Sequence, residues 1–195
     1  DREQVWRRES FMENTPKTIQ VVLGDITCLH VDAIVNAANS SLLGGGGVDG
    51  AIHRAAGKQL LEECKKLNGC AVSESKMTDV CQLPCKKIIH TVGSVWKGSS
   101  QGEPELLARC YETALQLVEE HGISSIAFPC ISTSVYHYLK KEAAQIALNA
   151  IRKTIKEGSH QGDVVLCCFL ISLGGLCIFL QSSVFYRKCG VGSGK

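Results

Sequence analysis

The sequence predicts an α/β protein in which a mostly parallel sheet lies between helices on both of its faces. Three observations support this fold class. Short apolar runs rich in β-branched residues predict strands, amphipathic stretches between them predict helices, and glycine or proline marks most junctions. Strands that alternate with helices are typical of parallel sheets, because a parallel connection has to return across the sheet.

The predicted strands are short runs with β-branched residues. The run at 32–37 is apolar on both faces, which places it in the centre of the sheet. The run at 76–83 ends at Pro84, and we expect an edge strand there. The six expected strands span residues 18–23, 32–37, 76–83, 87–92, 125–128 and 163–170.

The predicted helices carry their apolar residues on one stripe. Gly57 separates the first two helices, and Pro104 stands at the first position of the third, where its missing N–H is harmless. Gly122 ends that third helix. The four expected helices cover about residues 51–56, 58–67, 105–120 and 140–156.

Length and composition predict one globular domain without a highly charged partner. The chain has 195 residues, which is long enough for a sizeable core. Hydrophobic residues make up 45% and charged residues 21%, as in ordinary soluble domains. The net charge of +2 is too small to indicate nucleic acid or an acidic membrane surface as a partner. Residues 1–8 are charged and lack the apolar core of a signal peptide.

The 11 cysteines predict thiols in a reducing compartment. Their number is odd, they are scattered, and several lie inside apolar runs. The nearest candidates for a zinc site, Cys81 with Cys85 and Cys64 with Cys70, lack a paired C-x-x-C spacing. We therefore expect no metal site and a cytoplasmic and/or nuclear location.

The stretch from Asn36 to Gly50 is the one place where local structure and chemistry meet conspicuously. An apolar run predicts a buried strand, four consecutive glycines follow, and an apolar-periodic segment then predicts a helix. This geometry brings backbone N–H groups and a helix dipole up to an anion. Four glycines in a row are costly in chain entropy, so we expect this backbone to lie against a ligand.

Five motifs in the expected order resemble a macro domain and, more narrowly, the MacroD-type ADP-ribosylhydrolases. The resemblance runs from about Val21 to about Phe169. It implies a three-layer α/β/α domain over 17–170 with a mixed sheet of about six strands. An N-terminal arm or helix at 1–16 and an atypical apolar tail at 171–195 flank this domain. The motifs are GDIT at 24–27, VDAIVNAAN at 31–39, GGGGVDGAIHRAAG at 44–57, IHTVG at 89–93 and AFPCIST at 127–133.

The resemblance implies that Asp25 accepts a hydrogen bond from the adenine amino group of ADP-ribose, with the backbone N–H of Ile26 beside it. It also implies that Asn39 orients the distal ribose and that Asp49 positions a water molecule near the anomeric carbon. Each residue has a purely local alternative: Asp25 as a turn or N-cap residue, Asn39 in turn chemistry and Asp49 as a helix N-cap. The loop residues Gly45, Gly46, Gly47 and Val48 would wrap the distal ribose and the diphosphate.

A second loop completes the implied site and departs from the family pattern. Ser132, Thr133, Ser134, Val135 and Tyr136 would hold the diphosphate and pack on the distal ribose. The family has glycine at the positions of Ser134 and His137, and a side chain at the first of these hinders approach to the phosphates. His137 is either a new phosphate donor or a solvent-exposed loop residue.

The resemblance implies a metal-independent hydrolase without a cofactor. It would bind ADP-ribose and remove mono-ADP-ribose from acidic side chains of modified proteins, and it could also deacetylate O-acetyl-ADP-ribose. We expect a monomer with no direct nucleic-acid partner. A non-catalytic ADP-ribose reader with an impaired diphosphate loop is the alternative. An unrelated nucleotide-binding α/β protein is a third hypothesis, disfavoured because Asp25 matches the family's adenine-binding aspartate and a Walker lysine is missing.

The C-terminal part departs from the family as well. Residues 164–180 are nearly uncharged, and their length is at the short limit of a membrane span. The preferred interpretation is a last strand at 164–169 followed by an ill-fitting apolar tail. A span would remove a core strand from the sheet, so we expect no membrane association.

Overall fold

A computed structural model describes residues 19–80, 82–98, 100–131, 140–158, 162–168 and 185–188 of the chain. Its strands form one sheet in the order β3-β4-β2-β5-β6-β1-β7. Strand β3 is antiparallel to β4, and every other neighbouring pair is parallel. The strands are β1 (Ile19–Leu23), β2 (Ala33–Ala38), β3 (Ser75–Asp79), β4 (Lys87–Val92), β5 (Ser125–Phe128), β6 (Asp163–Cys168) and β7 (Phe185–Lys188).

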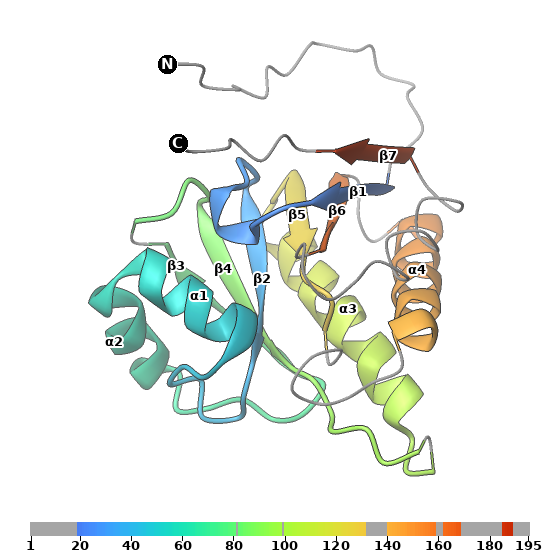
Figure 1. The fold of residues 1–195 in the computed structure, drawn as a ribbon, viewed down its shortest axis with the longest axis horizontal. Helices are drawn as coiled ribbons and strands as arrows, with labels where there is room; N and C mark the ends of the chain where they lie inside the picture. Colours follow the sequence, from blue (N-terminus) through green and yellow to red (C-terminus); the bar gives the residue numbers. More distant parts are fainter. Residues whose placement is uncertain are drawn as a thin grey trace, which may run out of the picture.

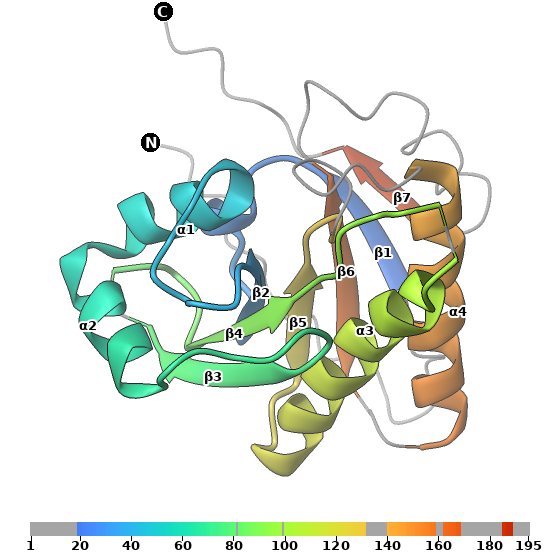
Figure 2. The ribbon, with the colours of Figure 1, turned by 90° about the horizontal axis from the view of Figure 1, so that it is seen from below.

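Helices cover both faces of this sheet, so the architecture has three layers. Figures 1 and 2 show α1 and α2 on one side of the molecule and α3 and α4 on the other. A short 3₁₀ helix, η1, contacts α1. The helices are η1 (Ile26–Cys28), α1 (Gly47–Ala56), α2 (Lys58–Lys66), α3 (Glu103–Glu120) and α4 (Lys140–Lys156).

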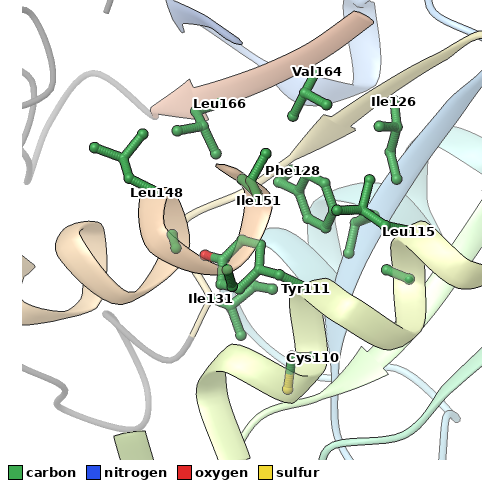
Figure 3. Close-up of a cluster of buried hydrophobic side chains, with 14 of the residues drawn as sticks. Cys110, Tyr111, Leu115, Ile126, Phe128, Ile131, Leu148, Ile151, Val164 and Leu166 are labelled. Carbon is green, nitrogen blue, oxygen red and sulfur yellow. The ribbon is translucent and has the colours of Figure 1, made fainter. Parts of the chain in front are cut away.

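The strands send alternate side chains into two separate cores. In β2, Val35 packs in the core under α3 and α4, whereas Ile34 packs in the core under α1 and α2. Figure 3 shows the first of these cores, where the rings of Tyr111 and Phe128 lie with their centroids 5.0 Å apart. Because both faces are buried, the central strands β2 and β5 are mainly apolar, as the sequence predicts for the centre of the sheet.

The structure confirms the predicted fold class. All six expected strands and all four expected helices form, although β3 ends at Asp79, before Pro84. Strand β7 was not expected. It extends the sheet beyond β1 and lies within the residues predicted to form the tail. Residues 1–16 and most of the tail lie outside the described part, so the predicted domain limits stay predictions.

The residues proposed as the start of a membrane span belong to the sheet, because Val164 to Cys168 pair with β1. Within the part of the chain that the structure describes, no helix is both long and apolar enough to cross a membrane. None of the eight described cysteines forms a disulfide, as the sequence predicts.

Candidate functional site

The carboxyl ends of five parallel strands meet at one edge of the sheet. Strands β4, β2, β5, β6 and β1 run in one direction, so the segments that follow them lie at this edge. Ligands of open α/β sheets bind outside such ends. Asp25 follows β1 and Asn39 follows β2, so the structure places both predicted ligand-binding residues at the same edge.

Asn39 holds the turn after β2. Its Oδ1 accepts hydrogen bonds from the Ser41 amide at 3.1 Å and the Ser41 hydroxyl at 2.6 Å. Its Nδ2 donates to the Gly44 carbonyl oxygen at 2.9 Å. These hydrogen bonds agree with the alternative that assigned Asn39 to turn chemistry. The side chain stays half-buried at the rim of the glycine loop, and a contact with ribose stays a prediction.

At two positions of the glycine loop, a side chain would come too close to neighbouring atoms. A Cβ atom at Gly45 would lie 3.1 Å from Asp49 Oδ2 and 3.3 Å from Asn39 Nδ2. The two predicted catalytic side chains therefore converge on Gly45. A Cβ atom at Gly50 would lie 2.5 Å from the Gly45 carbonyl oxygen, which requires glycine there as well. By contrast, a Cβ atom at Gly46 would meet nothing within 4 Å.

Asp49 lies in the first turn of α1 and is only 4% exposed. Gly46 is the N-cap of this helix, so the alternative that made Asp49 the cap is wrong. An acidic residue in the first turn is favoured by the helix dipole. Asp49 Oδ1 accepts a hydrogen bond from Asn36 Nδ2 at 2.8 Å. Its Oδ2 lies beside Gly45.

A column of buried polar side chains lies behind Asp49. Asn36 Nδ2 lies 3.1 Å from His90 Nδ1, and His90 Nε2 lies 3.0 Å from Thr78 Oγ1 and 3.6 Å from Cys64 Sγ. Burial, together with the charge that His53 can carry, lowers the pKa of His90 to about 4. His90 is therefore neutral near pH 7.

Several buried polar atoms at this edge lack a hydrogen-bond partner among the described residues. They include Asn36 Oδ1 and the hydroxyl of Ser94, which follows β4. His53 Nε2 also makes no hydrogen bond, although it lies 3.4 Å from Asp49 Oδ1, within ion-pair distance when the imidazole is protonated. Buried polar groups are normally satisfied, so these atoms indicate capacity for water or a ligand.

The carboxylate of Asp25 accepts hydrogen bonds from a residue of its own turn. Asp25 caps η1, and its Oδ1 accepts hydrogen bonds from the amide of Thr27 at 2.9 Å and from its hydroxyl at 2.7 Å. These hydrogen bonds agree with the alternative that made Asp25 a turn or N-cap residue. Its side chain is exposed, so capping and the predicted adenine contact are compatible. Ile26 is buried between η1 and α1, and the predicted role of its backbone N–H is untested.

The other predicted ligand-binding residues divide into two groups. Val48 is half-buried and begins α1 with Gly47, while Gly45 and Gly46 are exposed. The second loop, with Ser132, Thr133, Ser134, Val135, Tyr136 and His137, lies outside the described residues. Among the residues that the structure does describe, no cluster of three His, Cys, Asp or Glu side chains could hold a metal ion.

A hollow of about 430 Å³ adjoins the glycine loop on its outer side. Gly44 and Gly45 line it together with His53, Arg54 and Lys58. A larger hollow of about 470 Å³ lies at the opposite edge of the sheet, around Asp32 and Lys86. Of the predicted site residues, Gly45 lines the first hollow and none lines the second, so volume alone does not locate the predicted site.

Sequence reasoning missed Asn36, His53 and His90 as parts of the site. The signal was present for two of them, because Asn36 and His90 are polar residues inside apolar strand runs. Such residues need partners when buried. His53 stands four positions after Asp49, which places both side chains on one face of α1.

Comparison with known proteins identifies the class. A macro domain profile matches residues 35–147, more than half of the chain. A macro domain-containing protein of Mesorhizobium japonicum is 55% identical over 151 residues, which cover 77% of this chain and 86% of that protein. The chain belongs to the macro domain family.

The particular relatives include named enzymes. The human ADP-ribose glycohydrolase MACROD2 is 48% identical over 172 residues, 87% of this chain. The match spans only 40% of the human protein, so most of MACROD2 has no counterpart here. The chain also resembles solved structures. A variant of the Oceanobacillus iheyensis macrodomain with ADPR superposes with a TM-score of 0.77 at 42% identity, covering 84% of this chain and 90% of that one.

A second solved relative is the Trypanosoma brucei macrodomain in complex with ADP-ribose. It has a TM-score of 0.73 and 44% identity, and the match covers 78% of this chain and 64% of that chain. The family and the three-layer fold agree with the sequence predictions.

Proposed function

We propose that this macro domain binds ADP-ribose and hydrolyses the bond between mono-ADP-ribose and an acidic side chain of a modified protein. The convergence of Asn39 and Asp49 on Gly45 is the observation that carries the proposal. An amide and a carboxylate then face one small space beside exposed backbone N–H groups. The names of the human and trypanosomal relatives support the same ligand.

In the proposed reaction, Asn39 binds the hydroxyl groups of the distal ribose, because an amide offers both a donor and an acceptor. The oxygen of a water molecule forms a bond to the anomeric carbon. The bond from that carbon to the side-chain oxygen breaks, and the carboxylate leaves with the electron pair. Backbone N–H groups of both loops bind the diphosphate.

Asp49 Oδ2 orients the attacking water and accepts its proton as the bond to the anomeric carbon forms. A diphosphate oxygen, with Asp49 in support, is the second candidate for this task. Proton transfer of this kind contributes about 10²–10⁴-fold to the rate, and positioning of water and ribose contributes the remainder. The proposed mechanism uses no metal ion, so chelators are expected to leave turnover unchanged. Deacetylation of O-acetyl-ADP-ribose would use the same water.

An ADP-ribose reader without turnover is the second candidate function. It is supported by Ser134 and His137, which replace family glycines in the loop proposed to bind the diphosphate. A side chain at the first of these positions hinders close approach of the backbone to phosphate. The reader interpretation keeps the adenine and ribose contacts and loses only the geometry required for hydrolysis.

Two measurements on one sample separate the possibilities. Calorimetric titration with ADP-ribose tests binding, and release of ADP-ribose from a protein mono-ADP-ribosylated on glutamate tests turnover. Binding with turnover supports the hydrolase. Binding without turnover selects the reader, and absence of binding contradicts both functions.

A further inference from the structure

The buried polar column behind Asp49 connects the sheet with the helical layer formed by α1 and α2. Asn36 and His90 are register neighbours on β2 and β4, and both side chains point to the face covered by α1 and α2. Asp49 reaches the column from α1 and Cys64 from α2. Asn36 and His90 have no exposed surface, so water does not compete for these hydrogen bonds.

The donors in this column can be assigned from their chemistry. Asp49 Oδ1 only accepts when ionised, so the amide nitrogen of Asn36 has to face it. The same nitrogen has a second hydrogen, which points to His90 Nδ1 at 3.1 Å. Nδ1 then accepts, and the proton of the neutral ring lies on Nε2, where Thr78 Oγ1 accepts it at 3.0 Å.

We propose that His90 is a positioning residue for Asp49, acting through Asn36. By accepting from Asn36, the ring fixes the amide in the orientation that donates to Asp49 Oδ1. The carboxylate is thereby held in one rotamer, with Oδ2 directed at the space beside Gly45. This inference rests on the proposed function, because its consequence is the placement of the attacking water.

The surroundings of His90 keep its Nδ1 able to accept the hydrogen bond from Asn36. Cys64 comes from α2 and Thr78 from β3, while His53 and Asp49 approach from α1. Burial and His53 both lower the pKa of His90, so Nδ1 stays unprotonated and able to accept at neutral pH. A protonated ring would have a donor at each nitrogen, and the hydrogen bond from Asn36 would be lost.

Two conservative variants separate positioning from packing. In His90→Asn, the amide oxygen can occupy the place of Nδ1 and still accept from Asn36. In His90→Gln, the amide instead occupies the place of Nε2, and no acceptor faces Asn36. Both variants are neutral and polar, and both leave Asp49 and Asn39 intact. We expect kcat to fall at least about tenfold in His90→Gln and to be largely rescued in His90→Asn.

Binding gives the discriminating readout. The Kd for ADP-ribose, measured by calorimetry, should stay close to the wild-type value in both variants, because Asn39 and the glycine loop do not contact His90. Equal kcat in wild type and His90→Gln would overturn the inference, as would equal losses in the two variants. An inactive wild-type chain would instead contradict the proposed function itself.

Thr78→Val provides a second test if His90→Gln does not fold, which thermal unfolding would reveal. Valine retains the volume of threonine but removes the acceptor for the Nε2 proton, leaving only the weak acceptor Cys64 Sγ at 3.6 Å. The neutral ring can then move its proton to Nδ1. A fall in kcat at unchanged Kd supports the inference, and unchanged kcat overturns it.

Discussion

The two ends of the parallel strands use polar residues in opposite ways. At the amino ends, Asp32 ties neighbouring strands together: its carboxylate accepts from Lys86 Nζ at 2.8 Å and from the Ser124 amide at 3.0 Å, and its amide donates to Ser125 Oγ at 2.8 Å. At the carboxyl ends, Asn36 Oδ1 and Ser94 Oγ are buried without a described partner. The amino end has the larger hollow and satisfied polar groups. Unmet hydrogen-bonding capacity, more than volume, therefore distinguishes the edge at which we propose the site.

Matched substitutions of aspartate at the two ends test this difference most severely. Asp49→Asn keeps an acceptor for Asn36 but removes the charge that orients water, so kcat should fall about 10²–10⁴-fold. Asp32→Asn at the other end should leave kcat unchanged. Release of ADP-ribose from a mono-ADP-ribosylated protein measures both. Similar losses in the two variants would show that the ends do not differ in this way.

Acid unfolding should reveal the neutral histidine near the proposed site. The folded pKa of His90 is about 4, below the ordinary value of 6.5. Between these values the unfolded chain binds a proton that the folded chain does not, so stability falls as the pH drops through this window. The loss should reach about 2–3 kcal/mol between roughly pH 7 and pH 4.5. Urea unfolding at both pH values checks this, and His90→Asn should show a shallower dependence.

The carboxylate at the amino end also has a lowered pKa, but the pH window in which it loses stability lies lower. Burial alone would raise the pKa of Asp32, but hydrogen bonds from Lys86 and the Ser124 amide, with the charge of Lys86, lower it below its ordinary value. Its stabilising effect is thus complete above the ordinary carboxyl pKa and is lost only as the pH falls below it. The two ends should lose stability in successive pH windows.

A matched pair of glycine variants tests the convergence of Asn39 and Asp49. Gly45→Ala puts a methyl group between them, and ADP-ribose affinity should fall roughly tenfold. Gly46→Ala meets no protein atom within 4 Å and should change the affinity less. Calorimetry compares the two. An equal loss of affinity in the two variants would mean that any side chain on this loop hinders ADP-ribose. The position of Gly45 beside Asn39 and Asp49 would then have no particular importance for binding.

The smallest expected effect concerns the structural aspartate. Asp32→Ala should lower the free energy of unfolding by about 1–2 kcal/mol, because a half-buried ion pair and a hydrogen bond to backbone are both lost. Asp79→Ala is the control, since that residue forms an exposed ion pair with Lys87. Its unfolding midpoint should stay at the wild-type value. If both variants lowered the free energy of unfolding equally, Asp32 would contribute no more to stability than an exposed aspartate.

Most of the fold could be predicted because its signals are local. Apolar runs such as 32–37 and amphipathic stretches such as 140–156 carry their own periodicity. Strand β7 has no such signal, since Phe185 to Lys188 is short and half polar. Its pairing with β1 depends on the finished sheet, which a local pattern does not encode.

The candidate site divides in the same way. Asn39 and Asp49 belong to one contiguous motif and could be assigned by resemblance. The partnership of Asn36 with His90 depends on the register of β2 against β4, which brings together residues 54 positions apart. Sequence patterns gave the identity of these side chains but not that register. The local roles of Asn39 and Asp25 in turns also became visible only with their hydrogen bonds.

The position of β1 between β6 and β7 has a consequence for the order of folding. Ile19 pairs with Val164, 145 residues later in the chain, and the other neighbour of β1 follows still later. A ribosome must therefore synthesise most of the domain before β1 has a partner. Strands β2, β3 and β4 can pair much earlier, so the half of the sheet that carries Asn36 and His90 can assemble first. Such long-range pairing slows folding, because chain closure precedes the contacts that stabilise it.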